Sequence, residues 1–210
     1  MILFVSGSPE PHYAAMKAVE LERFAGQMSC PFARNDVRRG VALGMPWCLD
    51  NGCFNRYSPS AIVSVLLSFR GVPGCVFVPA PDVVGNHAAT LELFRQWIPI
   101  YTELDYPAAF VLQDGIDGEE DVPWDDIAAV FIGGSDKFKY SDVVRHIVTE
   151  ANRRGKWAHM GRVNTFKRIV YAASIGCDSV DGTRYQRFKD AYKFAPAFEQ
   201  RQMNLHEVLP

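Results

Sequence analysis

The sequence predicts an α/β fold, a compact (β/α)8 barrel of the TIM-barrel type in which one strand is missing or irregular. Seven short, uninterrupted apolar runs alternate with segments of helical periodicity, which is typical of parallel strands buried on both faces. Seven or eight such units favour a closed barrel over an open sheet. The 210 residues suffice for one such domain with a substantial core, although they are few for this fold. No G-x-G-x-x-G follows the first run, which weakens a dinucleotide-binding interpretation.

The expected elements follow one another in a regular order. Strands are expected at residues 1–5, 46–49, 75–78, 108–112 and 128–132, and two more within 156–184. Helices are expected at about 12–25, 58–69, 86–97, 141–152 and 165–175, where apolar residues recur at helical spacing. Gly26 and Gly176 are stop signals, and Ser58 with Pro59 is a helix start. Pro99 leaves the end of the helix at 86–97 open.

Two stretches are less regular than the rest. Residues 27–44 are expected either to form a loop over the site or to hide the eighth strand. Residues 1–188 are assigned to the barrel, and residues 189–210 to a C-terminal helical tail that packs on it. The sequence shows no internal repeat and no low-complexity segment.

The composition excludes several classes of protein. Apolar residues make up 48% of the chain, which argues against disorder, and a net charge of −2 supplies no global field for nucleic acid. Five scattered cysteines without a C-x-x-C pair predict reduced thiols and no structural zinc. No signal peptide and no run of membrane-spanning length is visible, so a cytoplasmic protein without membrane contact, cofactor or metal is expected.

Polar residues gather where the expected strands end. In a barrel these ends converge on one mouth, where active sites form. Two carboxylates across a small pocket can divide labour, one attacking an electron-poor carbon and the other moving protons. Bare glycine backbone allows a flat ligand to approach, and amides can read the edge of a base. The residues at the strand ends are Ser6, Ser8, Asp50, Asn51, Asp82, Gln113, Asp114, Gly133, Gly134, Ser135, Met160, Gly161, Arg162, Asp178 and Asp181.

Six of these strand ends carry a resemblance to a known family. Residues 50–54 (DNGCF) are similar to the Asp-Ser-Gly-Gly-Phe motif of the tRNA-guanine transglycosylase superfamily. Residues 113–115 (QDG) resemble its Gln-Gly-Gly, residues 133–134 its Gly-Gly-Leu, and residues 176–183 (GCDSVDGT) its Gly-x-Asp-x-x-Asp. Together with residues 159–164 (HMGRVN), the last motif resembles the phage and bacterial branch that modifies DNA with deazapurines. The resemblance covers residues 1 to about 188.

The resemblance implies a transglycosylase that exchanges guanine in DNA for a 7-deazaguanine, such as 7-cyano-7-deazaguanine. It implies that Asp181 is the nucleophile that forms a covalent glycosyl-enzyme at C1′, and that Asp50 is the acid/base. The target nucleotide must leave the duplex stack to react. The base-binding residues it implies are Asn51, Phe54, Asp82, Gln113, Gly133, Gly134, Met160 and Gly161.

Two departures from the family bear on the nucleic-acid substrate. The tRNA enzymes of the family are much longer and carry a zinc subdomain with a C-x-C-x-x-C motif, which this chain lacks. DNA is therefore favoured over tRNA, reached through local basic residues or with partner proteins that give access to it, in the cytoplasm of a host if a phage encodes the chain. The candidate phosphate contacts are Lys137, Lys139, Arg162, Arg168 and Arg184.

Other interpretations of the same residues stay open at this point. Asp50 and Asp181 each precede turn residues and could merely cap turns. Met160 fits the core as well as a ligand pocket, Asp178 is expected to be structural, and His159, pointing opposite to Met160, is expected in the barrel wall. The whole chain could be a barrel that binds deazapurines or nucleic acid without catalysis, a nucleoside N-glycosidase or a sugar-phosphate isomerase.

Overall fold

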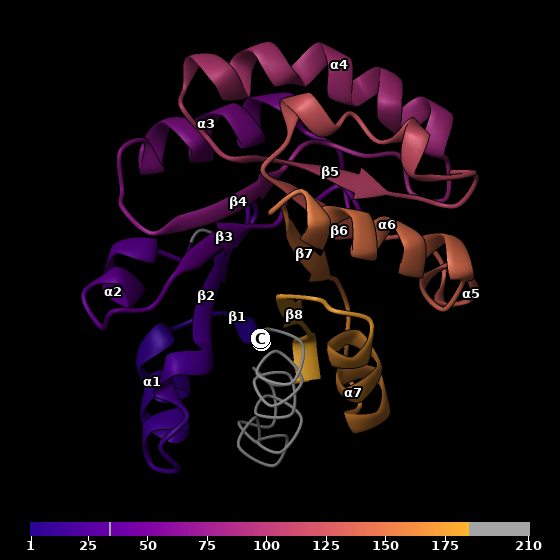
Figure 1. Ribbon diagram of the computed structural model, residues 1–210. Coiled ribbons are helices and arrows are strands. Elements are labelled where there is room, and N and C mark those ends of the chain that lie inside the picture. Colours follow the sequence, from indigo (N-terminus) through magenta and orange to yellow (C-terminus); the bar gives the residue numbers. More distant parts are fainter. Residues whose placement is uncertain (34, 185–210) are drawn as a thin grey trace.

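The chain folds into a closed barrel of eight parallel strands that follow one another around the barrel in chain order (Figure 1). The computed structural model describes residues 1–33 and 35–184. Strand β8 pairs with β1, with Ser179 opposite Ile2, and this pairing closes the barrel. The predicted fold class is confirmed, whereas the tail expected at 189–210 lies outside the described residues. The strands are β1 Ile2–Ser6, β2 Ala25–Ser29, β3 Trp47–Leu49, β4 Cys75–Pro79, β5 Ala108–Leu112, β6 Ala129–Ile132, β7 Trp157–Met160 and β8 Ser179–Asp181.

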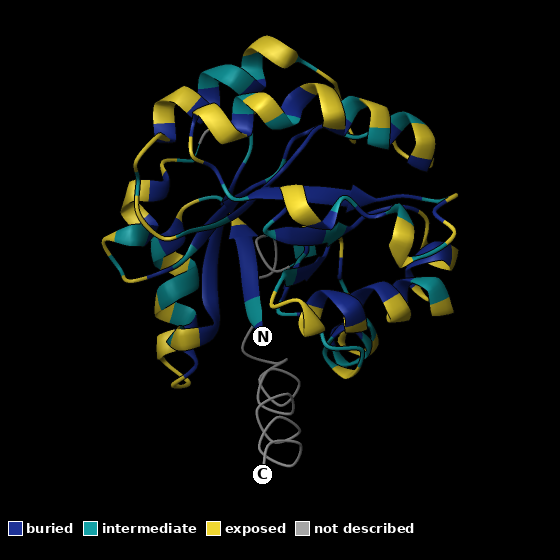
Figure 2. Cartoon of the chain, turned by 45° about the horizontal axis from the view of Figure 1, so that its top comes forward, coloured by how far each residue is buried: buried dark blue, intermediate teal, exposed yellow. Residues whose placement is uncertain are grey.

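Helices cover the outside of the barrel and turn their exposed faces to solvent (Figure 2). Between β5 and β6 the chain makes two short 3-10 turns, Glu119–Asp121 and Trp124–Asp126, where an α-helix is usual. Two short turns in place of a helix contribute to the small size of the domain. No helix within 1–33 and 35–184 combines the length and apolar character needed to cross a bilayer. The helices are α1 Pro9–Lys17, α2 Val37–Val41, α3 Pro59–Phe69, α4 His87–Glu103, α5 Asp136–Lys139, α6 Asp142–Arg153 and α7 Phe166–Ser174.

The core has two layers because successive residues of a strand point to opposite faces of the sheet. One cluster fills the barrel interior, and Phe4, Met28 and Phe77 are among its members. The larger cluster lies between the strands and the helices, and Trp47 and Phe110 are fully buried in it. The parity of each strand residue therefore decides whether its side chain can reach the mouth of the barrel.

The eighth strand is β2, and it overlaps the stretch that showed no periodicity. The helix predicted over 12–25 is wrong in its second half, because α1 ends at Lys17 and a 3-10 turn, Glu22–Phe24, leads into β2. Gly26, expected to stop a helix, lies inside the strand. A Cβ there would come within 2.5 Å of the Phe4 ring, so glycine is required for β1 and β2 to pack.

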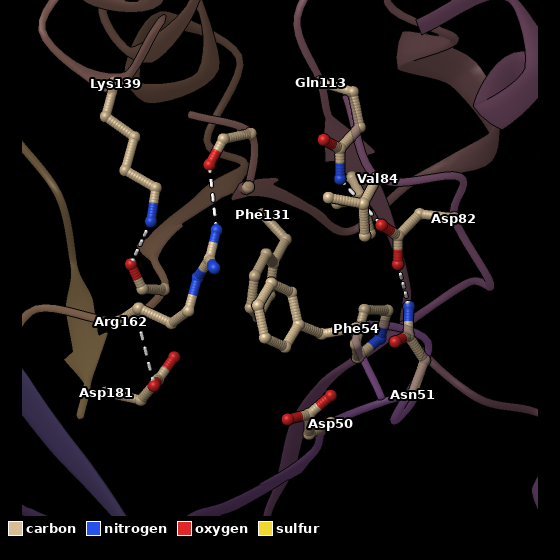
Figure 3. Close-up of a pocket in the computed structure, with 15 residues that line it drawn as sticks. Asp50, Asn51, Phe54, Asp82, Val84, Gln113, Phe131, Lys139, Arg162 and Asp181 are labelled. Atoms are coloured by element: carbon tan, nitrogen blue, oxygen red, sulfur yellow. Dashed lines mark hydrogen bonds between the residues drawn. The ribbon is translucent and has the colours of Figure 1, made fainter. Parts of the chain in front are cut away.

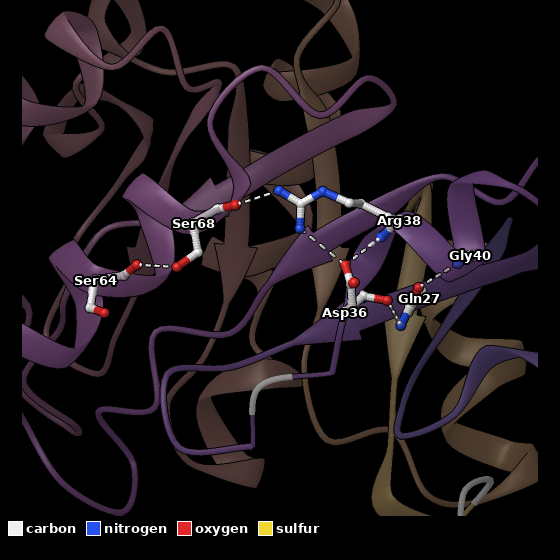
Figure 4. A network of polar contacts seen from close by, with 6 residues as sticks. All are labelled: Gln27, Asp36, Arg38, Gly40, Ser64 and Ser68. Atoms are coloured by element: carbon white, nitrogen blue, oxygen red, sulfur yellow. Dashed lines mark hydrogen bonds and ion pairs between the residues drawn. The ribbon is translucent and has the colours of Figure 1, made fainter.

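A buried polar residue in β2 explains why the strand is not recognisable as an apolar run. Gln27 faces the helical layer and is fully buried. Its Oε1 accepts from the Gly40 N–H at 3.1 Å and its Nε2 donates to the Asp36 carbonyl at 3.2 Å (Figure 4). Asp36 caps α2, and Arg38 donates to the carbonyl of Ser68 in α3 at 2.7 Å. The hydrogen bonds of the glutamine amide thus hold α2 against the strand, where apolar side chains hold the helices elsewhere in the barrel.

Helix α4 continues through Pro99 to Glu103, which settles the end that the sequence left open. The missing N–H of a proline removes one helical hydrogen bond. Buried side chains on both sides of the proline hold the helix against the barrel, with Trp97 before it and Tyr101 after it. The Tyr101 hydroxyl also donates to the carbonyl of Pro79, the last residue of β4, at 3.1 Å.

Candidate active site

A pocket of about 530 Å³, counting its open mouth, lies at the carboxyl ends of the strands (Figure 3). Strand ends contribute most of the wall, so the convergence expected from the sequence occurs. The lining residues are Asp50, Asn51, Phe54, Pro79, Asp82, Val84, Val111, Gln113, Phe131, Gly133, Gly134, Lys139, Gly161, Arg162 and Asp181.

Three carboxylates from three parts of the barrel line this pocket. Asp50 directly follows β3, Asp82 follows β4, and Asp181 is the last residue of β8. Burial raises the pKa of Asp50 from 3.8 to about 6, and the charges of Asp181 and Asp82 act in the same direction. The Gly52 N–H donates to Asp50 Oδ1 at 2.8 Å and opposes the shift without cancelling it. Asp50 can therefore carry a proton near neutral pH.

Two side-chain amides hold Asp82 in place. Asn51 Nδ2 donates to one Asp82 oxygen, and Gln113 Nε2 donates to the other, both at 2.7 Å (Figure 3). Burial raises the pKa of Asp82, while these two hydrogen bonds lower it. Asn51 Nδ2 also donates to the Ala80 carbonyl at 2.8 Å, which occupies both of its hydrogens. Asn51 therefore serves the pocket by orienting Asp82, while Gln113 keeps one N–H for a ligand.

The structure reverses the expected orientations of two neighbours in β7. Met160 was expected beneath the base, but it packs between strands and helices, is 2% exposed and does not line the pocket. His159, expected in the barrel wall, lies in the interior, and its Nε2 is 2.9 Å from Asp181 Oδ2. Phe131 lines the pocket where Met160 was expected to, and Gly161 lines it as predicted.

The side chains of Asp178 and Asp181 have separate tasks. Asp178 Oδ2 accepts from the Ala158 N–H at 2.8 Å and joins β7 to β8, which agrees with the structural role expected for it. Asp181 Oδ2 faces His159, and its Oδ1 accepts from the Arg162 N–H at 3.2 Å. The carboxylate is thus held from two sides while its side chain lines the pocket.

Glycines at two strand ends are required by the space around them. Gly134 has φ of +69°, and a Cβ there would lie 2.6 Å from the Phe138 ring. A Cβ on Gly161 would lie 2.8 Å from the Phe131 ring and 3.4 Å from Asp181 Oδ2. A larger residue at Gly161 would press on the pocket wall beside Asp181.

Aromatic rings and arginines meet at the rim of the pocket. The Phe54 side chain is 61% exposed, and the Arg162 guanidinium lies over its ring at 4.4 Å. Arg162 Nη2 also donates to the Gly134 carbonyl at 2.9 Å. The backbone of Arg162 itself has a φ of +59°, which is uncommon for a residue other than glycine. A second such pair, Arg56 over Phe32 at 4.6 Å, lies outside the pocket lining, with the Phe32 ring beside Gly52.

The expected phosphate contacts differ in their surroundings. Lys137 is exposed, whereas Lys139 is 4% exposed and donates to the Gly161 carbonyl. Burial first, and then the charge of Arg162, lower the pKa of Lys139 from 10.5 to about 8, although the charge of Asp181 opposes the shift. Lys139 is therefore a pocket residue and is not positioned to contact a surface-bound strand. Arg168 pairs with Asp136, and the Arg184 N–H donates to Asn164.

Within residues 1–33 and 35–184, no cluster of three or more His, Cys, Asp or Glu side chains is arranged to hold a metal ion. The cysteines near the site behave as packing residues. Cys177 is fully buried, and burial raises the pKa of Cys53 to about 12, so that thiol is not activated as a nucleophile.

Comparison with known proteins supports the fold and goes no further. No family model and no curated protein matches the chain. A solved structure, the Amycolatopsis orientalis BexX/CysO complex, contains a chain similar to this one, with a TM-score of 0.56. The alignment covers 96% of this chain and 88% of that chain at 13% sequence identity. At this identity the likeness shows a shared fold, the barrel described above.

Proposed function

We propose that the protein is a transglycosylase that exchanges guanine in DNA for a 7-deazaguanine base. The observation that carries the proposal is one pocket lined by Asp50, with its raised pKa, and by Asp181, held on two sides by donors. Glycosyl chemistry of this kind requires one carboxylate to attack and another to transfer a proton. The resemblance of the strand-end motifs to guanine transglycosylases assigns the same two residues to these roles.

In the first half of the reaction, an oxygen of Asp181 attacks C1′ of the target nucleotide. The C1′–N9 bond breaks, its electron pair goes to the purine, and Asp50 gives its proton to the leaving base. In the second half, Asp50 takes the proton from N9 of the 7-deazaguanine, and N9 displaces Asp181 from C1′. At pH 7 a carboxyl with a pKa of about 6 is roughly a tenth protonated, so both forms of Asp50 are populated.

The walls of the pocket suit a flat base with polar edges. Asp82 presents a carboxylate fixed by two amides, which can accept from the N–H groups of a guanine edge. Gln113 offers the donor that Asp82 leaves free, and the Gly133-Gly134 backbone lies beside it. Phe131 and Val111 supply apolar surface for the faces of the ring.

The rim supports nucleic acid as the source of the target base. Phe54 is exposed beside the pocket with Arg162 stacked on it, and Phe32 with Arg56 forms a second pair. Aromatic rings with cations are typical platforms for unpaired bases. A target nucleotide that leaves the duplex could enter the pocket while its neighbours stack on these rings.

The deciding experiment incubates the protein with guanine-containing DNA and 7-cyano-7-deazaguanine, followed by mass spectrometry of the nucleosides. The wild type should yield the deazaguanosine, and Asp181→Ala should yield none. Wild-type exchange of labelled guanine by Asp181→Ala would show that the nucleophile is misassigned. Asp114→Asn is the matched control, because Asp114 also follows a strand but bonds Ser135 and does not line the pocket.

Two other outcomes would replace the proposal. Tight binding of the base without exchange on any DNA would identify a binding protein. Hydrolysis of free nucleosides without activity on polymers would identify a nucleoside N-glycosidase.

A further inference from the structure

We infer that His159 is a positioning residue, which fixes the nucleophilic carboxylate of Asp181 through a buried chain of hydrogen bonds that also includes Trp157 and Ser179. This inference rests on the proposed role of Asp181 and adds to it three residues that do not line the pocket. They occupy inward positions of β7 and β8, where His159 and Ser179 lie opposite each other in register.

The chain of contacts is continuous from the barrel interior to the pocket. Trp157 Nε1 donates to Ser179 Oγ at 2.7 Å. Ser179 Oγ is 2.8 Å from His159 Nδ1, and His159 Nε2 is 2.9 Å from Asp181 Oδ2. Ser179 and His159 are fully buried, so solvent water does not compete for their hydrogen bonds.

The chemistry of the partners favours one placement of the hydrogens in this series of contacts. The indole N–H of Trp157 can only donate, so Ser179 Oγ accepts from it. The single hydrogen of the Ser179 hydroxyl is then free to point at His159 Nδ1, which accepts. With Nδ1 accepting, the one proton of a neutral imidazole lies on Nε2 and is donated to Asp181. A carboxylate opposite Nε2 requires the same tautomer, so both ends of the chain agree.

The rings around His159 fix the direction in which it donates. Its ring centroid lies 4.6 Å from that of Phe131, 5.0 Å from Phe77 and 6.0 Å from Phe4. In this packing the imidazole has little freedom to turn. A fixed donor holds one Asp181 oxygen, as the Arg162 amide holds the other, and sets the direction in which the carboxylate faces C1′.

The first test does not depend on turnover. In protein labelled with ¹⁵N-histidine, the His159 resonances should be those of a neutral ring protonated at Nε2. His159→Gln assigns them by their disappearance. A proton on Nδ1, alone or in addition to Nε2, would overturn the inference. If the wild type exchanges no base, the proposed function fails, and this spectrum still decides the tautomer.

The second test compares His159→Leu with His159→Gln. The glutamine amide N–H can occupy the place of Nε2–H, whereas leucine suits the aromatic surroundings but cannot donate. Leucine should lower kcat about tenfold to hundredfold with KM nearly unchanged, the usual size of a hydrogen bond to a charged group. Glutamine should recover most of that rate.

A packing role for His159 predicts the opposite order, with leucine the better substitute in both activity and thermal stability. If leucine were the more active of the two variants, or if the loss lay in KM, the positioning role would be wrong. Circular dichroism melts of both variants show that each is folded at the assay temperature.

Discussion

Replacing Asp50 with asparagine should stabilise the folded protein above pH 7 while ending base exchange. The pocket raises the pKa of Asp50 to about 6 through burial and through the charges of Asp181 and Asp82. The folded state therefore binds more protons than the unfolded chain between pH 4 and 6. Stability from this group is complete below about pH 4 and is lost as the pH rises through 6.

The size of the effect follows from the shift. A difference of about two pKa units corresponds to about 3 kcal/mol at pH values above both titrations. Asparagine stays neutral, and its Oδ1 can still accept from the Gly52 N–H. The unfolding free energy of Asp50→Asn minus that of the wild type should therefore rise by about 2–3 kcal/mol between pH 4 and pH 8.

Urea unfolding of both proteins at several pH values measures this difference. Asp114→Asn is the control with the opposite sign: burial raises the pKa of Asp114, but the Ser135 hydroxyl and amide lower it more, for a net decrease. A difference for Asp50→Asn that stays flat with pH, or that falls, would refute the reasoning. Gained stability together with lost exchange would show that the acid is kept at a cost to folding.

Two further predictions test the rim and the second strand. Phe54→Ala should weaken DNA binding about fivefold to hundredfold with an unchanged salt slope, because stacking releases no counterion. Exposed Lys137→Ala should reduce the salt slope by about one. Fluorescence anisotropy over a salt series checks both, and the same slope in the two variants would contradict them. Gln27→Leu should destabilise the fold by about 1–3 kcal/mol in urea, since it leaves the buried Gly40 N–H without its acceptor, and an unchanged midpoint would contradict this account of β2.

The sequence located a strand most accurately where both of its faces are apolar. Residues 108–112 are the example, because β5 coincides with the predicted run and all its residues are buried. Strand β2 escapes the same rule for a physical reason. The side chain of Gln27 points outward and accepts a hydrogen bond from Gly40 in α2. Gly26 has no side chain because the Phe4 ring occupies the space where one would lie. Neither partner is near in sequence, so no local pattern could announce the strand.

The sequence allowed the residues that line the pocket to be predicted better than the role of each one. Strand ends converge whatever their sequence, so Asp50, Asp82 and Asp181 could be expected in one place. The duty of Asn51 could not be anticipated, because it depends on a carboxylate and a carbonyl about thirty residues away. The pKa of Asp50 likewise depends on burial and on charges from other strands, which no motif of five residues contains.

The error over Met160 and His159 was avoidable with information already in the sequence. Adjacent residues of a strand cannot both face the pocket. If Asp181 points inward, Ser179 does too, and if Gly161 lines the pocket, His159 must share its face of β7. Alternation therefore places a histidine and a serine on the same inward face as Asp181, the proposed nucleophile. When this alternation is followed from Asp181 and Gly161, it finds the residues that support the pocket as well as those that line it.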